Sequence, residues 1–350
     1  MLYLHVGLHK TGTSAIQAFL HQNERRLRTL GYDYSPIGRS GANPHHSLGW
    51  ELIQSGQQQP QLGGLADLAA ACLKASGHVV VSSESFSRAN DAQVRQLGVL
   101  FKDVPLQVVL YLRHPAELIQ SSYFQLAKNG LNLRDFDSYF ERSLAGGRVR
   151  FLDQARRWLT MASGRLRLRV YETGQLVNDD LIDDFLTAID AAHLIGDPEL
   201  KRQGLVNTSP GPKTIILTQE LTRQLGGREQ LTQESRLMLQ KVREAATAAG
   251  WDSEKINLIT PAHAQRVEEV CAQQMEGVAR EILGRADGRL FYKGPRVGHD
   301  RLPKLTDLPH QELIAVLLQG LRQPADPRVK ATPIRQLPQG EIRRRGKPAG

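Results

Sequence analysis

The stretch Tyr3-Leu-His-Val-Gly-Leu-His-Lys-Thr-Gly-Thr-Ser14 decides the fold that we expect for this chain. Residues 2–6 alternate between apolar and polar side chains as in a short strand, and residues 15–30 carry apolar side chains at helical spacing before Gly31. A strand, a glycine-rich turn and a helix in this order direct the backbone N–H groups of the turn and the positive end of the helix dipole at one point. The stretch therefore predicts a site for phosphate or sulfate groups, and a tight turn without a ligand is the alternative.

The turn differs from a regular phosphate-binding loop in the place of its lysine. The pattern Gly-x-x-x-x-Gly-Lys-Ser/Thr has lysine directly after the second glycine, whereas Thr13 follows Gly12 here and the lysine is Lys10, inside the turn. A lysine at this place lies nearer the bridging oxygens of a bound anhydride. The sequence therefore argues against a magnesium–nucleoside triphosphate as the ligand.

A second motif follows about a hundred residues later. Residues 105–112 predict a buried strand that runs directly into Arg113. The forked guanidinium suits a phosphate, Pro115 suits the first turn of a helix, and Ser121 lies about two turns further along the same helix face. An ordinary strand–helix connection is the alternative, but the pairing with the first motif favours a second anion contact.

The two motifs together resemble those of sulfotransferases that use 3′-phosphoadenosine 5′-phosphosulfate (PAPS), in the carbohydrate-sulfotransferase-like branch. The turn at residues 7–14 resembles the loop that binds the 5′-phosphosulfate, and the strand end Tyr171-Glu172 extends the resemblance to about residue 190. The residues that match the spacing of the 3′-phosphate motif are Arg113, Pro115, Ser121 and Tyr123. His114 and Glu117 depart from the commoner asparagine and aspartate.

The resemblance implies a three-layer α/β/α fold with a central, mainly parallel sheet, similar to P-loop NTPases. It also implies an enzyme that moves the sulfuryl group of PAPS to an acceptor hydroxyl without a metal and releases 3′-phosphoadenosine 5′-phosphate (PAP). Lys10 would stabilise the leaving nucleotide. The cofactor-binding residues that it implies are Lys10, Thr11, Gly12, Thr13, Ser14, Arg113 and Ser121.

Glu84 is the candidate general base, because it follows the predicted strand 78–82. Ligands of parallel α/β sheets bind beyond the carboxyl ends of the strands, so this strand end should meet the two motifs. The family resemblance implies that a glutamate here takes the acceptor proton in the carbohydrate-acting branch, which favours a glycan or glycolipid acceptor. His9 is the second candidate for the catalytic base, and a solvated loop glutamate is the plain alternative for Glu84.

Two further segments contain candidate ligands. The segment 290–298 resembles the carboxyl-terminal loop that holds the 3′-phosphate in small-molecule sulfotransferases, so Lys293 and Arg296 are candidates, although Tyr292 replaces the arginine of that loop. A basic turn is the alternative. His45 and His46 lie in an irregular excursion over residues 33–63 and could contact substrate or be plain loop residues.

Length and composition predict one large domain. The chain has 350 residues, 40% of them hydrophobic, and we expect a single domain over residues 1–300 in which residues 33–63 and 196–285 lie on the substrate side. Residues 301–350 hold much of the formal charge of +9, which predicts a largely disordered basic tail that is either solvated or in weak contact with anionic surfaces. The charges are not interleaved with aromatic residues, so we expect no specific nucleic acid.

The location that we expect is cytoplasmic. The chain has only two cysteines, and we find no apolar run of membrane-spanning length and no leader. We predict no metal site, and the oligomeric state is not indicated. Two other classes stay open: a P-loop kinase for a small molecule, and a non-catalytic module that binds a nucleotide or a glycan.

Overall fold

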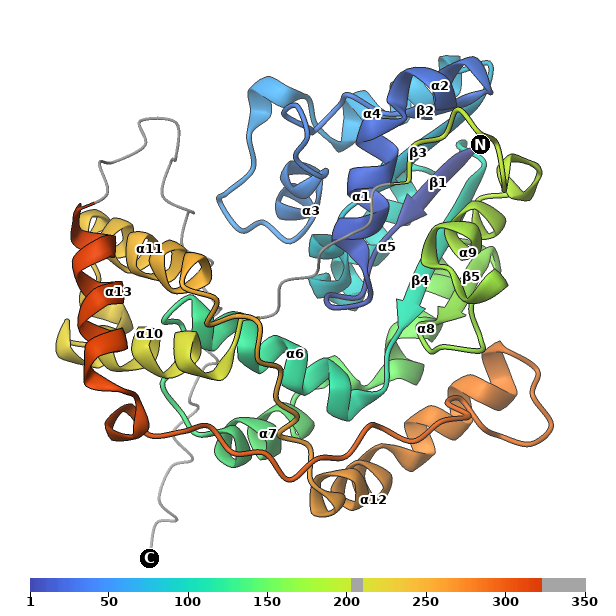
Figure 1. The fold of residues 1–350 in the computed structure, drawn as a ribbon. Coiled ribbons are helices and arrows are strands. Elements are labelled where there is room, and N and C mark those ends of the chain that lie inside the picture. Colours follow the sequence, from blue (N-terminus) through green and yellow to red (C-terminus); the bar gives the residue numbers. More distant parts are fainter. Residues whose placement is uncertain (203–209, 323–350) are drawn as a thin grey trace, which may run out of the picture.

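A computed structural model describes residues 1–202 and 210–322, whose arrangement is drawn in Figure 1. The sheet consists of β1 (Leu2–His5), β2 (Tyr32–Tyr34), β3 (His78–Ser82), β4 (Leu106–Leu112) and β5 (Leu166–Val170). Every neighbouring pair is parallel, and the order across the sheet is β2-β3-β1-β4-β5. The central strand is therefore β1, and the segments that follow β1, β3 and β4 leave the sheet at the same edge.

The sheet is apolar on both faces because side chains alternate along each strand. Leu2 and Leu4 of β1 pack into one hydrophobic cluster, whereas Tyr3 packs into the other. All seven residues of β4 are buried, as expected for a parallel strand that is covered on both faces.

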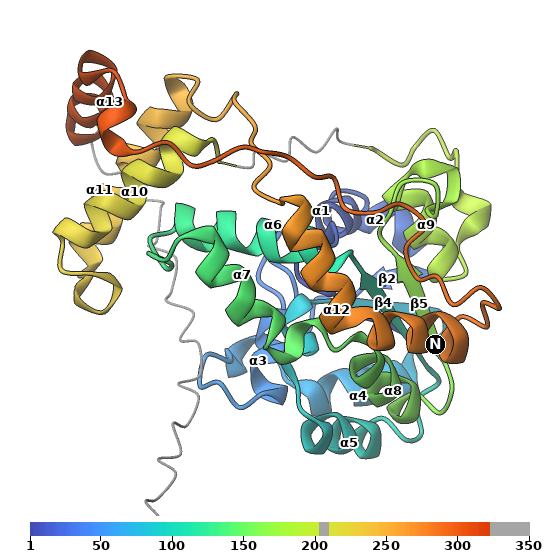
Figure 2. The same cartoon turned by 90° about the horizontal axis from the view of Figure 1, so that it is seen from below.

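Helices cover both faces, which gives three layers (Figures 1 and 2). One face is covered by α1 (Thr13–Gln22), α2 (Glu24–Thr29) and α9 (Leu181–Ala188). The other is covered by α4 (Leu65–Lys74), α5 (Asp91–Leu100), α8 (Phe151–Met161) and α12 (Pro261–Gly277), the last of which continues as a π-helical turn over Val278–Ile282. The fold is thus α/β with an all-parallel sheet, as the sequence predicts.

Three further helices shape the edge at which the strands end. The short helix α3 (His46–Leu52) packs beside the 3₁₀ turn Glu84–Arg88 that follows β3. The long helix α6 (Pro115–Lys128) starts directly after β4 and Arg113, and α7 (Phe136–Leu144) packs against it. Since α6 extends beyond the sheet, it supplies a wall for any ligand at this edge.

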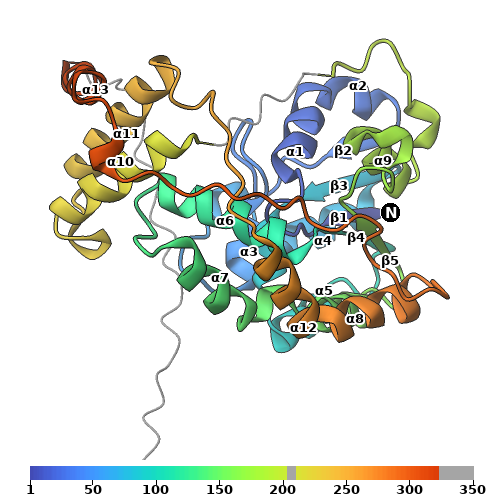
Figure 3. The same cartoon turned by 60° about the horizontal axis from the view of Figure 1, so that its bottom comes forward.

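A separate lobe of three helices lies beside α6 (Figure 3). It consists of α10 (Pro212–Gln224), α11 (Gln233–Ala248) and α13 (His310–Arg322), which enclose a small hydrophobic cluster of their own. The prediction of a disordered tail from residue 301 is therefore wrong for residues 310–322, because Val316 and Leu313 of α13 pack against α10 and α11. The last part of the predicted tail, residues 323–350, lies outside the described residues, as do residues 203–209 of the predicted substrate-side segment.

Two other differences from the sequence prediction are local. The helix expected over residues 15–30 is two helices, because α1 ends at Gln22 and α2 begins at Glu24. The side chain of Asn23, between them, donates to the Phe19 carbonyl at 2.9 Å and to the Lys201 carbonyl at 2.9 Å. The strand β2 was not predicted, because its three residues are too few for an alternating pattern to be recognised.

Candidate active site

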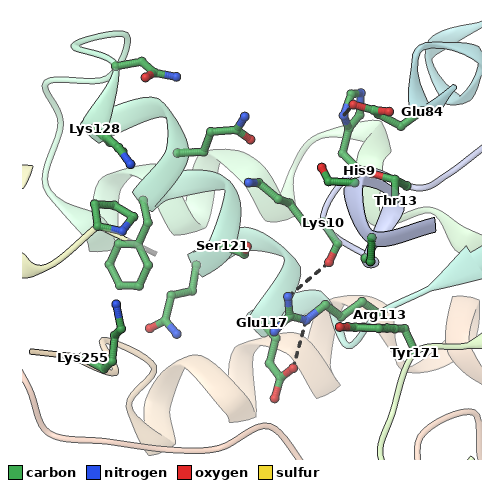
Figure 4. A pocket seen from close by; sticks show the side chains of 18 of the residues that line it. His9, Lys10, Thr13, Glu84, Arg113, Glu117, Ser121, Lys128, Tyr171 and Lys255 are labelled. Carbon is green, nitrogen blue, oxygen red and sulfur yellow. Dashed lines mark hydrogen bonds and ion pairs between the residues drawn. The ribbon is translucent and has the colours of Figure 1, made fainter. Parts of the chain in front are cut away.

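A cavity of about 640 Å³ lies between the turn after β1 and helix α6, and Figure 4 shows the side chains that line it. This volume lies within the range of sites for small molecules and cofactors. Most of the residues predicted from the motifs line it, namely His9, Lys10, Gly12, Thr13, Ser14, Glu84, Arg113 and Ser121. The sequence prediction that three strand ends meet at one site is therefore confirmed in its geometry.

The turn after β1, which lines this cavity, has an unusual backbone conformation. Gly7 and Gly12 have φ angles of 102° and 78°, and Lys10 has a φ of 70°, which is uncommon for a residue with a side chain. A Cβ atom on Gly7 would lie 3.1 Å from the Cβ of Glu84, so glycine allows the turn to approach the end of β3 closely. Gly12 is the N-cap of α1 and has no side chain to cap the helix; its carbonyl accepts from the Ala15 N–H at 2.9 Å, so Thr13 and Ser14 are the residues whose N–H groups have no partner within the helix.

Thr11 has a different role from its neighbours in the turn. Its side chain is buried, and its hydroxyl donates to the carbonyl oxygen of Leu8 at 2.7 Å. Of the predicted cofactor-binding residues 10–14, all of which the structure describes, Thr11 alone does not line the cavity. Thr11 therefore shapes the turn, whereas Thr13 and Ser14 present their groups to the cavity.

Arg113 joins the two sequence motifs directly. Its Nη1 donates to the carbonyl oxygen of Lys10 at 3.1 Å, its Nε donates to Glu117 Oε2 at 3.1 Å, and its guanidinium carbon lies 5.6 Å from the centre of the Tyr171 ring. These contacts fix the guanidinium at the cavity wall, as the dashed lines in Figure 4 show. Ser121 lies two turns further along α6 and faces the same cavity.

Glu84 lies between two histidines at the other end of the turn. Its Oε1 is 3.7 Å from His9 Nδ1 and 3.7 Å from His46 Nε2, and its Oε2 accepts a hydrogen bond of 3.1 Å from Gln17 Nε2. Burial alone would raise the pKa of the Glu84 carboxyl, but the charges of His46 and His9, its own backbone N–H and the Gln17 amide lower that pKa to about 2. Glu84 is therefore a carboxylate throughout the neutral pH range.

The two adjacent histidines point in different directions and do different things. His45 is fully buried, and its Nε2 is 2.8 Å from the Ser35 carbonyl oxygen, so it ties the loop after β2 to the core. His46 stacks on Trp50 at 5.5 Å, and its Nδ1 lies 2.9 Å from Ser83 Oγ. These contacts orient the His46 ring so that its Nε2 faces Glu84.

A buried polar chain continues from Glu84 into the sheet. The Gln17 amide that donates to Glu84 lies 3.3 Å from Ser82 Oγ, which is 2.8 Å from Nδ1 of His5. Burial lowers the pKa of His5 to about 4, so this ring is neutral near pH 7. The chain therefore supports the carboxylate with neutral donors rather than with a further charge.

Lys293 and Arg296 do not line the cavity, and both are exposed. The backbone N–H groups of Tyr292 and Lys293 donate to the carboxylate of Glu172 at 2.8 and 3.0 Å, and the Arg296 carbonyl accepts from the Asn257 amide at 2.7 Å. Their segment is thus anchored beside the end of β5 by its backbone.

The sequence motifs did not identify several residues that complete the site. Gln17 and His46 contact Glu84, and Lys128 and Lys255 line the end of the cavity away from Glu84 (Figure 4). Gln17 lies on the predicted helix after the turn, one turn beyond Ser14, so its approach to the site was open to helical-wheel reasoning. Lys128 lies seven residues after Ser121 on the predicted helix, so the same reasoning could have found it. His46 was a candidate for contact with substrate but not with Glu84, and both His46 and Lys255 come from segments whose position only the tertiary fold determines.

Comparison with protein-family models, with curated proteins and with solved structures found no match. Within residues 1–202 and 210–322, no group of three or more His, Cys, Asp or Glu side chains is arranged to hold a metal ion. Over the same residues, no helix combines the length and the apolar character needed to cross a membrane.

Proposed function

We propose that this protein is a sulfotransferase with a P-loop-like fold that uses PAPS and transfers its sulfuryl group to the hydroxyl of an acceptor, with a glycan or a glycolipid as the favoured acceptor. One observation carries the proposal. Lys10, Glu84 and Arg113 reach a single cavity from the ends of three neighbouring strands, and each comes from a different one.

The residues around the cavity fit the charge of such a cofactor. The cationic lining residues are Lys10, Arg113, Lys128 and Lys255, against the two carboxylates Glu84 and Glu117. The N–H groups at the start of α1, with the hydroxyls of Thr13 and Ser14, would hold the 5′-phosphosulfate. Arg113 and Ser121 would hold the 3′-phosphate, since a fixed guanidinium binds phosphate through paired hydrogen bonds.

The chemistry divides between the two ends of the turn. PAPS supplies an activated sulfuryl group when it is bound. Lys10 would stabilise the negative charge that develops on the bridging oxygen of the leaving nucleotide. Glu84 would accept the proton of the acceptor hydroxyl, and because its pKa is about 2 it holds that proton weakly, so His9 Nδ1, 3.7 Å away, is a second place for it.

The first test is calorimetric titration of the full chain with PAP in EDTA, with adenosine 5′-phosphate, ADP and ATP titrated in parallel, with and without Mg²⁺. We expect metal-free binding that needs the 3′-phosphate. Arg95→Ala is a matched control for Arg113→Ala, because Arg95 is an exposed arginine on α5, away from the cavity. Binding of Mg-ATP in preference to PAP would reject the proposal in favour of a kinase.

The second test separates an enzyme from a binding module. PAP-binding protein would be incubated with PAPS and a panel of neutral and charged glycans and glycolipids, and released PAP would be measured. Turnover that is lost in Glu84→Gln while PAP affinity is retained supports the transferase. If PAP binds with the same affinity to the wild type and to Glu84→Gln, and neither protein turns over PAPS with any acceptor, the protein is a non-catalytic binding module.

A further inference from the structure

A small side pocket adjoins the main cavity beside His9. Its volume is about 40 Å³, and His9 and Gln125 line both the pocket and the main cavity. A cavity needs only about 10–15 Å³ to hold one water molecule, so this pocket has room for a group of a few heavy atoms. It is therefore too small for a sugar ring and large enough for a substituent of one.

The lining of this pocket combines cationic and polar side chains with two leucines, Leu126 and Leu131. Arg88 and Arg148 supply two guanidinium groups, and Ser122 and Gln125 of α6 supply a hydroxyl and an amide. No carboxylate is among the lining residues that the structure describes. Guanidinium groups pair with carboxylate, sulfate and phosphate oxygens, so the pocket has the chemistry of an anion site.

The two arginines come from different parts of the fold, and one of them lies in the same 3₁₀ turn as the proposed base, Glu84. Arg88 ends the 3₁₀ turn that begins with Glu84, and Arg148 lies in a second 3₁₀ turn, Gly147–Val149, between α7 and α8. The pocket shares His9 with the end of the main cavity where Glu84 lies, and His9 is in contact with that carboxylate. A group in the pocket would therefore belong to the acceptor rather than to a nucleotide held by Arg113.

We propose that the acceptor carries an anionic substituent, which Arg88 and Arg148 bind in this side pocket while the acceptor hydroxyl faces Glu84. This inference rests on the proposed function, and it narrows the acceptor class from glycans in general to acidic ones. Carboxylate groups and sulfate ester groups both present negatively charged oxygens, which is the chemistry that the pocket recognises.

The test is calorimetric titration of the full chain with three tetrasaccharides, with and without saturating PAP. Chitotetraose is neutral, a hyaluronan tetrasaccharide carries carboxylates, and a carrageenan tetrasaccharide carries sulfate esters. We expect at least one charged tetrasaccharide to bind more tightly than chitotetraose, and Arg88→Gln and Arg148→Gln each to weaken it by roughly 10-fold or more, as for the loss of a charge-assisted hydrogen bond. The affinity for chitotetraose and for PAP should not change.

Arg150→Gln is the matched control, because it removes the same charge two residues from Arg148 at an exposed position outside the pocket lining. Equal binding of neutral and charged tetrasaccharides, absence of binding by both charged ones, or equal losses in Arg148→Gln and Arg150→Gln would overturn the inference. Failure of the proposed function would be seen separately, because PAP would then not bind. The titrations without PAP would still measure whether the pocket binds a charged tetrasaccharide.

Discussion

Replacement of Arg113 by alanine should separate the effect of its contact with the Lys10 carbonyl from that of the proposed contact with a 3′-phosphate. Its Nη1 donates to the Lys10 carbonyl at 3.1 Å, and loss of such a bond costs about 1 kcal/mol, or about fivefold in affinity for any nucleotide that needs the turn in place. A charge-assisted bond to a 3′-phosphate would add about 1.5–3 kcal/mol, or roughly 10- to 150-fold, for PAP alone.

The assay is titration calorimetry of wild type, Arg113→Ala and Arg95→Ala with PAP and with adenosine 5′-phosphate, which lacks the 3′-phosphate. We expect Arg113→Ala to weaken adenosine 5′-phosphate by about fivefold or less and PAP by at least tenfold more than that. Equal losses for the two nucleotides would refute the assignment of Arg113 to the 3′-phosphate.

Four other outcomes follow from the site. Lys10→Ala should lower turnover far more than PAP affinity, and equal losses measured by kinetics and calorimetry would contradict its role at the leaving group. Glu84→Gln should lower turnover by about 100-fold or more with unchanged PAP affinity, as for a lost general base; a smaller effect would move that role to His9. Gly12→Ala should lower the free energy of unfolding, measured by urea titration, more than Gly31→Ala does. Both glycines have positive φ, but a Cβ would collide with Leu181 at Gly12 and would meet no atom within 4 Å at Gly31. Equal losses in the two variants would argue against the contact with Leu181. Since the pKa of Glu84 is lowered from 4.5 to about 2, its charge stabilises the fold above pH 4.5, and this contribution is lost as the pH falls toward 2. Between pH 6 and pH 3.5 the free energy of unfolding of the wild type should therefore fall by roughly 1 kcal/mol more than that of Glu84→Gln. Equal falls in the two proteins would be evidence against the lowered pKa.

The elements that could be predicted from sequence are those whose pattern is local. β3 has the bounds predicted, and β4 differs from its prediction by one residue, because a run of buried apolar residues identifies a parallel strand. The turn after β1 could be predicted because Gly7 and Gly12 mark two of the three places where its backbone has positive φ, whereas the third, at Lys10, has no such signal in the sequence. The position of Arg113 at the cavity could be predicted because this residue directly follows β4.

The surroundings of Glu84 could not be predicted in the same way. His46 reaches Glu84 from an excursion 38 residues earlier in the chain, and nothing in the local sequence separates its role from that of His45. What separates them is tertiary: Trp50 and Ser83 orient one ring, and the Ser35 carbonyl holds the other. α13 was missed for a related reason, because the charged residues that follow it dominated the composition of its segment.

The lobe of α10, α11 and α13 has a consequence for the order of folding during synthesis. Its first two helices are complete at residue 248, but α13 ends at residue 322, after the chain has returned to the sheet to form α12. The close approach of Gly320 to Val242, where a Cβ would lie 2.9 Å from the Val242 Cα, can form only when those last residues have been made. At ordinary rates of translation this takes roughly 4–15 seconds, during which α13 cannot yet cover the α11 surface around Val242.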